Sequence, residues 1–246
     1  MAASANHGVH HEVEGGGSAM NLDVKHIYKA WGELVIYRDF SASFPRNQIS
    51  SIVGPSGCGK TTLLNMMAGT MRPDHGSLDD FRNKSISVIF QEPRLLPWKT
   101  VQENLVFVLR EHYPAHRCQA MAGEYIDMVG LSEFVHYYPA QLSGGMKQRV
   151  SMARAFAYPS EIILMDEPFR ALDVKLKENL VRSFVRLWET DKRTVIFVTH
   201  DIDEALLLGS VIFVFSRAPV QLVERIDRKT SAEEESVLKR RIIDRL

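Results

Sequence analysis

This sequence of 246 residues has few cysteines, no net charge and no long apolar run. Its two cysteines, Cys58 and Cys118, exclude a disulfide-stapled scaffold and fit a reducing compartment. The 30 Lys and Arg residues balance 30 Asp and Glu residues, which excludes the strongly basic surface of a general nucleic-acid-binding protein. The longest apolar stretch, residues 205–215, is too short to span a bilayer, so we expect any membrane role to be exerted through a partner.

The chain is long enough for one globular domain that buries its own core. Residues 1–20 differ from the rest, because they contain the run Gly15-Gly16-Gly17-Ser18 and three histidines, His7, His10 and His11. This composition predicts a flexible, solvated tail, with a metal site as the less favoured alternative. We therefore expect a single domain over residues 21–246.

Short apolar runs bounded by turn residues predict a series of strands: Leu22–Tyr28, Leu34–Tyr37, Phe40–Phe44, Ile49–Val53, Ile86–Phe90, Ile162–Met165, Val195–Thr199 and Val211–Phe215. Apolar periodicity between turn residues predicts helices: Thr61–Ala68, Glu103–Arg110, Cys118–Val129, Met146–Ala157, Asp173–Glu189, Ile202–Leu208 and a charged helix within Ser231–Leu246. The last three strands are almost continuously apolar, as expected for a parallel sheet covered on both faces. The sequence thus predicts an α/β fold with a mainly parallel core sheet, an N-terminal antiparallel β layer and an inserted helical subdomain over about residues 92–157.

The first chemical motif fits the pattern G-x-x-x-x-G-K-[ST] and reads Gly54-Pro55-Ser56-Gly57-Cys58-Gly59-Lys60-Thr61, followed by Thr62. The glycines let backbone N–H groups turn inward around phosphate oxygens, and the next helix directs its positive dipole end at the same anion. We expect Lys60 to contact the β- and γ-phosphates of a nucleotide and the Thr61 hydroxyl to bind Mg²⁺. The motif lies between a predicted strand and a predicted helix, which favours a phosphate loop over a chance glycine turn.

The second motif is the apolar strand 162–165, which ends in two carboxylates, Asp166 and Glu167. The strand would deliver both to the carboxyl edge of the sheet, where α/β proteins bind ligands. There Asp166 would hold Mg²⁺, and Glu167 would act as the general base that polarises the attacking water. Taken alone, an acidic pair at a strand end is equally consistent with a helix cap, but beside a phosphate loop we favour the catalytic interpretation.

Two further polar residues follow predicted strands at the same edge. His200 follows the strand 195–199, where it could hydrogen-bond a γ-phosphate and the attacking water, although a lone histidine there is more often structural. Gln91 follows the strand 86–90, where its neutral amide could ligate Mg²⁺ or order the water. By itself Gln91 would be an ordinary polar strand end. We include both as candidate catalytic residues, and Gln91 also as a candidate metal ligand.

The segment Leu142-Ser143-Gly144-Gly145-Met146-Lys147-Gln148-Arg149 resembles the signature loop of ATP-binding cassette (ABC) ATPases. Considered by itself, Ser143 before two glycines could be a second anion-binding helix N-terminus or an ordinary capped helix start. The resemblance implies that Ser143, Gly144 and Gly145 face the ATP of an opposing subunit, so that two nucleotides are sandwiched in a head-to-tail homodimer. It also implies the P-loop NTPase fold of the ABC type.

Other segments, over about residues 22–220, follow the motif order of this family. Trp31 resembles the aromatic residue that stacks on adenine, with Tyr28 as the alternative and a surface or core tryptophan as the structural interpretation. Gln91 falls at the Q-loop glutamine. Ala171-Leu172-Asp173 matches the D-loop, which makes Asp173 a candidate ATP contact, and Thr199-His200-Asp201 matches the segment of the switch histidine.

The resemblance also implies partners and a location. We expect ATP hydrolysis with Mg²⁺, transmembrane permease subunits as partners, a substrate-binding protein as an indirect partner, and no nucleic acid. The expected place is peripheral, on the cytoplasmic face of the inner membrane. Two residues depart from the family pattern: Met146 replaces the usual glutamine of the signature, with little loss expected, and Arg170 stands where the D-loop stretch usually has a small residue. The bulky cation at 170 is expected to affect dimer geometry and rate mildly.

Residues 91–104 and 215–219 are similar to the ATPases of importers of nitrate, sulfonates and taurine. Our hypothesis is therefore the energy-coupling ATPase of a bacterial importer of such a solute, with bicarbonate, cyanate and pyrimidine vitamin precursors left open as cargo. No residue of this chain would touch the cargo. The alternative is a soluble ABC ATPase that acts in assembly or regulation without transport.

Overall fold

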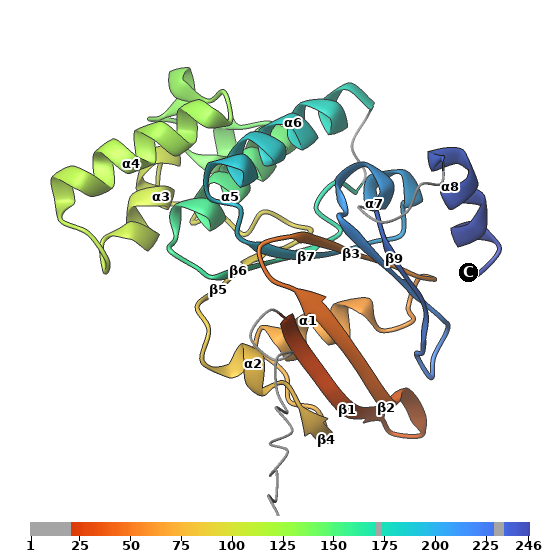
Figure 1. Ribbon diagram of the computed structural model, residues 1–246. Helices are drawn as coiled ribbons and strands as arrows, with labels where there is room; N and C mark the ends of the chain where they lie inside the picture. Colours follow the sequence, from red (N-terminus) through yellow and green to blue (C-terminus); the bar gives the residue numbers. More distant parts are fainter. Residues whose placement is uncertain (1–20, 171–173, 229–233) are drawn as a thin grey trace, which may run out of the picture.

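The computed structural model describes residues 21–170, 174–228 and 234–246 (Figure 1). The predicted tail at residues 1–20 and the candidate residue Asp173 lie outside these ranges. The strands are β1 (Asn21–Trp31), β2 (Leu34–Pro45), β3 (Ile49–Val53), β4 (His75–Ser77), β5 (Ile86–Ile89), β6 (Ile162–Asp166), β7 (Thr194–Thr199), β8 (Val211–Phe215) and β9 (Leu222–Asp227). The helices are α1 (Lys60–Met67), α2 (Asp79–Arg82), α3 (Val101–Leu109), α4 (Ala115–Met128), α5 (Gly144–Ala157), α6 (Val174–Asp191), α7 (Ile202–Leu208) and α8 (Glu235–Ile243), with short 3-10 turns η1 (Ser132–Phe134) and η2 (Pro139–Gln141).

The central sheet has its strands in the order β5-β6-β7-β3-β8-β9. The pairs from β5 to β8 are parallel, and β9 is antiparallel to β8 at one edge. This sheet confirms the predicted, mainly parallel α/β architecture. The sequence analysis does not predict β9, because its residues alternate between half-buried and exposed, and such an edge strand lacks the continuous apolar run of a central strand.

A smaller antiparallel sheet, in the order β2-β1-β4, forms the N-terminal β layer. The prediction of two short strands at 34–37 and 40–44 is wrong, because β2 runs through both. The chain kinks at Asp39, where φ is 54°, and β1 has a similar kink at His26, where φ is 52°. The Nδ1 atom of His26 lies 2.7 Å from the Oδ1 atom of Asp39, so the two irregular residues contact each other across the hairpin. The strand is therefore continuous where the sequence suggests a break.

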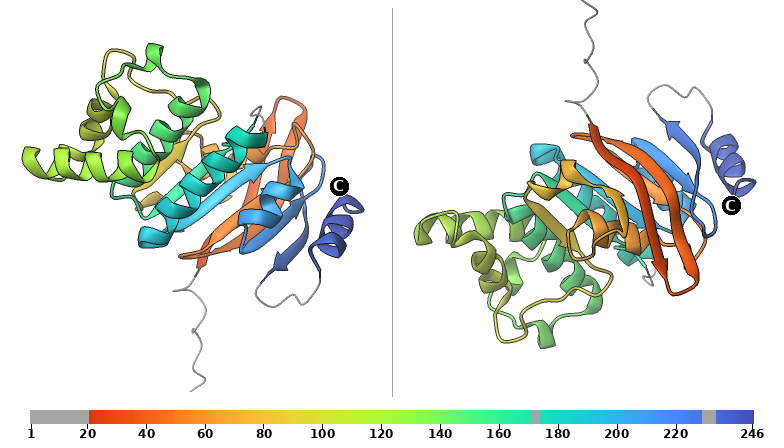
Figure 2. Two further views of the ribbon diagram at one scale, coloured as in Figure 1. Left: turned by 90° about the horizontal axis from the view of Figure 1, so that it is seen from above. Right: turned by 90° about the horizontal axis from the view of Figure 1, so that it is seen from below.

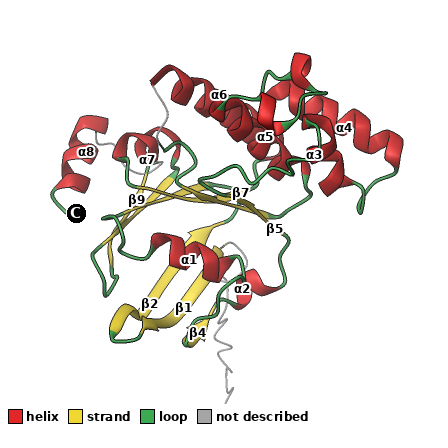
Figure 3. Cartoon of the chain, turned by 180° about the vertical axis from the view of Figure 1, so that it is seen from behind, coloured by secondary structure: helices red, strands yellow, loops and turns green. Residues whose placement is uncertain are grey.

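The central sheet is covered on both faces (Figures 1 and 3). Helix α1 and the smaller sheet pack on one face, and α5, α6 and α7 lie on the other. Neighbouring residues of one strand therefore face different layers: Ile162 and Leu164 pack toward α1, whereas Ile163 and Met165 pack toward α5 and α6. Because both faces are covered, most positions of the central strands are apolar.

The helical region formed by α3, α4 and α5 lies between β5 and β6 in the chain. It projects from one end of the central sheet, as the two views of Figure 2 show. Helix α5 returns from this region to the sheet and packs against β5 and α6. Among the described residues, no helix combines the length and the apolar character needed to cross a bilayer.

Aromatic rings join the two sheets. The ring of Phe44 on β2 lies 4.5 Å from that of Phe213 on β8, and Phe40 lies 5.2 Å from Phe215 in an edge-to-face arrangement. All four rings are buried. Ring pairs of this kind add to the free energy gained from burial alone, so this seam holds the β layer in place under the central sheet.

Phe213→Ala should destabilise the protein by about 3–5 kcal/mol, because it removes a fully buried ring and leaves a cavity between the sheets. The midpoint of urea unfolding, followed by circular dichroism, measures this change. The matched control is Phe107→Ala, since Phe107 on α3 is partly exposed, and its effect should be about 0.5 kcal/mol. Equal losses in the two variants would contradict a special role for the seam.

Candidate functional site

The motif at residues 54–61 comprises the loop that follows β3 and the first two residues of α1. Its Gly59 has a φ of 121°, and a Cβ atom there would lie 2.5 Å from the Cγ2 atom of Ile36. The Tyr37 hydroxyl donates to the Gly59 carbonyl at 2.9 Å, so β2 supports the loop directly. Only glycine satisfies both the backbone angle and the space. The resulting sharp turn leaves the N-terminus of α1 at the loop, where it favours an anion.

Lys60 is the first residue of α1, and its side chain folds back over the loop. The side chain is buried, and its Nζ atom donates to the carbonyls of Gly54 at 2.8 Å and Pro55 at 2.9 Å. The loop carbonyls therefore hold a positive charge inside the curve of the loop, beside the helix N-terminus. An ammonium group in this place can exchange its carbonyl partners for phosphate oxygens.

The other predicted residues of the loop differ in exposure. Ser56 and Gly57 are exposed, and Thr62 is half-buried in the first turn of α1. Cys58 is buried, and burial raises the pKa of its thiol. A buried thiol with a raised pKa is a packing residue and a poor nucleophile. The chemistry of the loop therefore rests on its backbone, on Lys60 and on Thr61.

Thr61 and Asp166 meet although 105 residues separate them. The Thr61 hydroxyl donates to the Oδ1 atom of Asp166 at 3.0 Å. Burial raises the pKa of Asp166 and the charge of Glu167 adds to the rise, while the Thr61 hydrogen bond acts in the opposite direction. Mg²⁺ prefers such oxygen ligands and is usually held by one or two carboxylates plus phosphate. In the described ranges there is no cluster of three or more His, Cys, Asp or Glu side chains that could hold a metal ion.

Glu167 occupies a strained turn after β6. Its φ is 42°, in the left-handed region, and its N–H donates to the Val198 carbonyl at 3.0 Å. Its Oε2 atom lies 3.4 Å from the Nδ1 atom of His200 and 2.9 Å from the Nη1 atom of Arg170. The structure thus brings a carboxylate and an imidazole together beside Asp166.

The backbone around His200 is fixed from two sides. Asp201 caps α7 by accepting hydrogen bonds from the first-turn N–H groups, and Lys177 of α6 pairs with both Asp201 and Glu204. Burial by itself would raise the pKa of Asp201, but the hydrogen bond and charge of Lys177 hold it below its ordinary value. The Thr199 hydroxyl donates to Glu204 at 2.6 Å. The sequence analysis gives Lys177 no role, since nothing in the local pattern of α6 marks it.

Gln91 lies just past the end of β5, and its side chain is exposed. Strand β5 pairs in parallel with β6, with Ile89 opposite Met165. Continuing this register by two residues sets Gln91 level with Glu167 at the same sheet edge. The backbone therefore brings the candidate glutamine to the region of the carboxylates.

Gln148 of α5 links the two segments that flank the site, and the sequence analysis assigns it no separate role. It is buried, and its Nε2 atom donates to the Pro168 carbonyl at 3.1 Å and to the Phe90 carbonyl at 3.4 Å. One side chain therefore connects the residues next to Gln91 and Glu167 to the helix that begins after Ser143. A buried amide costs stability unless it is hydrogen-bonded, so this bridge specifies one arrangement of the three segments.

Ser143 is the N-cap of α5, and its hydroxyl accepts the N–H of Met146 at 3.3 Å. Gly144 is exposed. Gly145 packs against α6, where a Cβ atom would lie 2.8 Å from the Leu176 side chain. Within one chain Ser143 therefore acts as a helix cap, and its second predicted role depends on a second subunit.

Trp31 lies at the end of β1, beside the hairpin turn to β2. It is 54% exposed, and the Lys29 ammonium lies 5.1 Å from the centroid of its indole. The alternative, Tyr28, is half-buried, and its ring lies 5.9 Å from that of His75. The indole is more exposed than the Tyr28 ring, so this geometry favours Trp31 over Tyr28 as the adenine contact.

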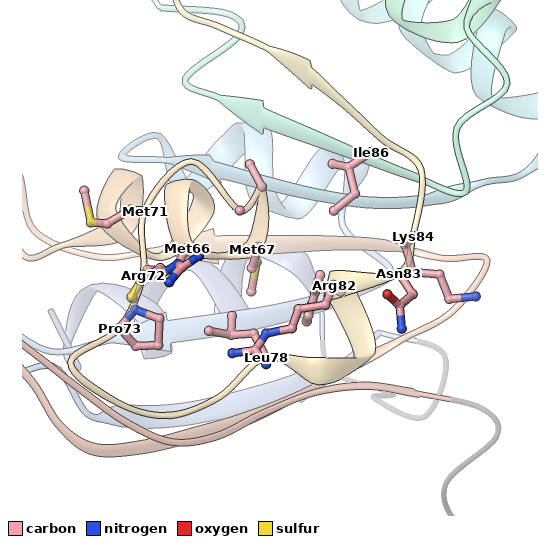
Figure 4. A pocket seen from close by; sticks show the side chains of 13 residues that line it. Met66, Met67, Met71, Arg72, Pro73, Leu78, Arg82, Asn83, Lys84 and Ile86 are labelled. Atoms are coloured by element: carbon pink, nitrogen blue, oxygen red, sulfur yellow. The ribbon is translucent and has the colours of Figure 1, made fainter.

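A separate hollow of about 720 Å³ lies at the other end of α1 (Figure 4). Its lining combines apolar and cationic side chains, among them Met66, Met67, Leu78, Arg72 and Arg82. The carboxyl end of a helix carries the negative end of its dipole, which disfavours a phosphate. The phosphate site is therefore expected at the loop before α1 and not in this hollow.

The sequence matches the ABC transporter family over residues 37–170. It is 36% identical over 221 residues to the aliphatic sulfonates import ATP-binding protein of Bacillus anthracis, covering 87% of this chain and 86% of that protein. The chain belongs to the ABC transporter family. This ABC ATPase binds ATP and hydrolyses it.

Further relatives place the same ABC ATPase among ATP-binding proteins of similar length. It is 37% identical over 212 residues to the taurine import ATP-binding protein of Yersinia pestis, covering 83% of each chain. It is 36% identical over 204 residues to the nitrate import ATP-binding protein of Synechococcus elongatus, covering 79% of this chain and 74% of that one. A solved dimeric ATP-binding cassette in a post-hydrolysis state, bound to ADP and Pi, superposes with a TM-score of 0.72 at 30% identity, covering 83% of this chain and 97% of that one. These findings confirm the predicted ABC ATPase fold.

Lys60→Ala should weaken ATP binding by about 10- to 100-fold, because it removes a charged hydrogen-bond donor from the loop. Isothermal titration calorimetry with ATP measures the dissociation constant. Lys25→Ala is the matched control, since Lys25 is an exposed lysine on β1, and its affinity should equal that of the unmodified protein. Unchanged affinity in the Lys60 variant would refute the phosphate loop.

Proposed function

We propose that this ABC ATPase is the energy-coupling subunit of a bacterial importer and works as a homodimer attached to transmembrane permease subunits. The observation that carries the proposal is the meeting of the 54–61 loop with Asp166, Glu167 and His200 at one sheet edge. The proposed place is the cytoplasmic face of the inner membrane. We take residues 21–246 as one ABC ATPase domain with a helical subdomain over about residues 92–157.

Nucleotide binding would use the loop after β3, the Thr61 hydroxyl and the Asp166 carboxylate. The loop N–H groups and Lys60 would hold the ATP phosphates, and Trp31 would stack on the adenine. Thr61 and Asp166, with Gln91, would hold Mg²⁺, which when bound neutralises charge on the phosphates. The 3.0 Å contact between Thr61 and Asp166 supports this assignment, because the hydroxyl and carboxylate oxygens already lie next to each other.

Glu167 is the proposed general base of hydrolysis. A water oxygen attacks the γ-phosphorus, the bond from phosphorus to the bridging oxygen breaks, and ADP leaves with the electron pair of that bond. Glu167 accepts the proton that the water loses. His200, whose Nδ1 atom lies 3.4 Å from the Glu167 carboxylate, would hydrogen-bond the γ-phosphate and the water.

The signature segment would act on the ATP of a second subunit. Support comes from the exposure of Gly144 at the start of a long helix, α5, whose N-terminus favours an anion. Asp173 would join this interface. Contacts that form only when ATP is bound would stabilise the closed dimer relative to the open one. ATP would therefore bind the closed state more tightly, as a ligand must do to switch a protein between two states. The solved relative, a dimeric cassette with ADP and Pi, supports the same assembly.

The permease would contact the segment after Gln91 and the start of α3. Trp98 of this segment is exposed, as are Tyr137 and Tyr138 and, farther along α3, Phe107. The N–H of Val101 donates to the Tyr137 carbonyl at 2.9 Å, so the two aromatic segments adjoin. Exposed aromatic residues that gather in this way are typical of surfaces that bind other proteins.

Asn104 makes this surface rigid. It is buried, its Oδ1 atom accepts the Leu96 N–H at 2.8 Å, and its Nδ2 atom donates to the Thr100 carbonyl at 2.9 Å. The Arg154 guanidinium of α5 donates to the Arg94 carbonyl at 3.0 Å. Both side chains tie the loop after Gln91 to the helical region. A movement of Gln91 would therefore be transmitted to the permease surface, because the loop between them is held by hydrogen bonds.

We propose nitrate, a sulfonate such as taurine, or a related small solute as cargo. Support comes from the similarity of residues 91–104 and 215–219 to ATPases of such importers and from the relatives named for these solutes. A substrate-binding protein would deliver the solute to the permease. Because no residue of this chain would contact the cargo, its identity has to be tested in the whole transporter.

Glu167→Gln should bind ATP normally but lose at least about 100-fold in turnover and accumulate as an ATP-bound dimer, since the base is gone while the site remains. Phosphate release measures turnover, and size-exclusion chromatography with ATP measures the dimer. Normal turnover would remove Glu167 from the role of base.

Ser143→Arg in the Glu167→Gln background should abolish the ATP-dependent dimer, because a bulky cation would fill the space between the two subunits. ATP binding by the single chain should persist. Ser236→Arg on α8 is the matched control, since Ser236 is exposed and lies outside the proposed interface. A dimer that survives the Ser143 change would contradict the cross-subunit contact.

Affinity purification from intact membranes should recover this protein together with a multi-spanning membrane protein. The double change Trp98→Ala and Phe107→Ala should reduce that recovery several-fold, whereas Val237→Ala, at an exposed apolar residue of α8, should not. Mass spectrometry of the purified material identifies the partner. Recovery with soluble partners alone would instead favour the assembly or regulatory ATPase.

A further inference from the structure

Glu167 carries an ion pair that the proposed reaction does not use. The Nη1 atom of Arg170 donates to its Oε2 atom at 2.9 Å, and the Nδ1 atom of His200 lies 3.4 Å from the same oxygen. The Glu167 side chain is 15% exposed and that of Arg170 is 51% exposed. The carboxylate that would accept a proton from water is therefore already held by a guanidinium.

The backbone builds this contact into the turn after β6. The N–H of Arg170 donates to the Glu167 carbonyl at 3.2 Å, which closes the turn, and Phe169 anchors it in the core. Gln148 holds the same turn through the Pro168 carbonyl. The two charged residues are thus fixed at a spacing of i, i+3, where oppositely charged side chains meet readily. The contact follows from the position of an arginine in a rigid turn.

We propose that Arg170 is a positioning residue that holds the Glu167 carboxylate away from the attacking water and slows hydrolysis until this ion pair breaks. The inference rests on the proposed role of Glu167 as general base. Arg170 and His200 both contact the Oε2 atom of Glu167. The ion pair therefore fixes the orientation of the whole carboxylate, and in this proposal turning the carboxylate toward a water at the γ-phosphate breaks the contact with the guanidinium. The interaction free energy of the pair is then part of the barrier to hydrolysis.

If Arg170 instead helped catalysis, its removal would change kcat in the opposite direction. If the guanidinium oriented Glu167 toward the water, removing it would lower the rate. If the pair were only a surface contact of the turn, removing it would leave the rate unchanged. The direction of the change in kcat therefore separates restraint from orientation and from a merely structural contact.

Arg170→Ser should raise the kcat of the purified subunit about three-fold and leave the KM for ATP unchanged, because the contact involves the base and not the nucleotide. Arg170→Lys keeps the positive charge, so its kcat should lie between those of Arg170→Ser and the unmodified protein. The ratio of the Arg170→Ser rate to the unmodified rate should fall toward one as salt rises to about 0.5 M, since salt screens an exposed ion pair. Phosphate release measured over a range of ATP concentrations gives kcat and KM for each variant, and its repetition at several salt concentrations gives the rate ratio.

Arg82→Ser is the matched control. Arg82 also forms an i, i+3 ion pair, with Asp79 at 3.0 Å, on the short helix α2, and its pair is exposed. Removing this pair should leave kcat unchanged. Circular dichroism and the melting temperature verify that each variant is folded.

An unchanged or lower kcat in Arg170→Ser overturns the proposal, and so does a gain that is equal at low and high salt. The double variant Arg170→Ser with Glu167→Gln should be as inactive as Glu167→Gln alone, since the restraint acts through Glu167. Substantial turnover in Glu167→Gln would overturn the assignment of the base, and with it this inference. An inactive Glu167→Gln together with a slower Arg170→Ser would overturn the restraint alone.

Discussion

Parallel pairing of the central strands is the constraint on which the site depends. Strands β3, β5, β6 and β7 all end at one edge, so the four segments that follow them are brought together whatever their distance in sequence. The hydrogen bond between Thr61 and Asp166 is the most direct result, since it joins the residue after the phosphate loop to the end of β6. Without the parallel pairing, the Thr61 hydroxyl and the Asp166 carboxylate would not be brought next to each other.

A second layer of contacts sets how the edge communicates with the rest of the molecule. Gln148 connects α5 to the turns after β5 and β6, and Asn104 fixes the loop that leads from Gln91 to α3. The elements that would sense the nucleotide and those that would meet a permease are therefore joined by buried, hydrogen-bonded amides. A coupling subunit needs such stiffness, because a motion at one end has to appear at the other.

The turn after β6 combines a strained backbone with an ion pair. Glu167 adopts a left-handed backbone conformation and contacts both His200 and Arg170 through one oxygen. Strained residues at a site persist only when the surrounding structure holds them, and here the Val198 carbonyl and the buried Phe169 do so. Arg170 adds a contact with Glu167 that a small residue could not make, at the position where the sequence departs from the pattern that the resemblance implies.

The sequence by itself determined the α/β class, the central strands and the glycine-rich loop that joins β3 to α1, because continuous apolar runs and a glycine-lysine spacing are local signals. It did not reveal that β2 is one strand, since the kinks at His26 and Asp39 are held by a contact across the hairpin. Nor did it reveal the ion pairs of Lys177 and Arg170 or the bridge of Gln148. Only the tertiary structure decided the Lys177 pairs and the Gln148 bridge, because contacts between distant segments depend on where the strands place them. The Arg170 pair is local in sequence, but it depends on the left-handed turn at Glu167, which the Val198 carbonyl holds.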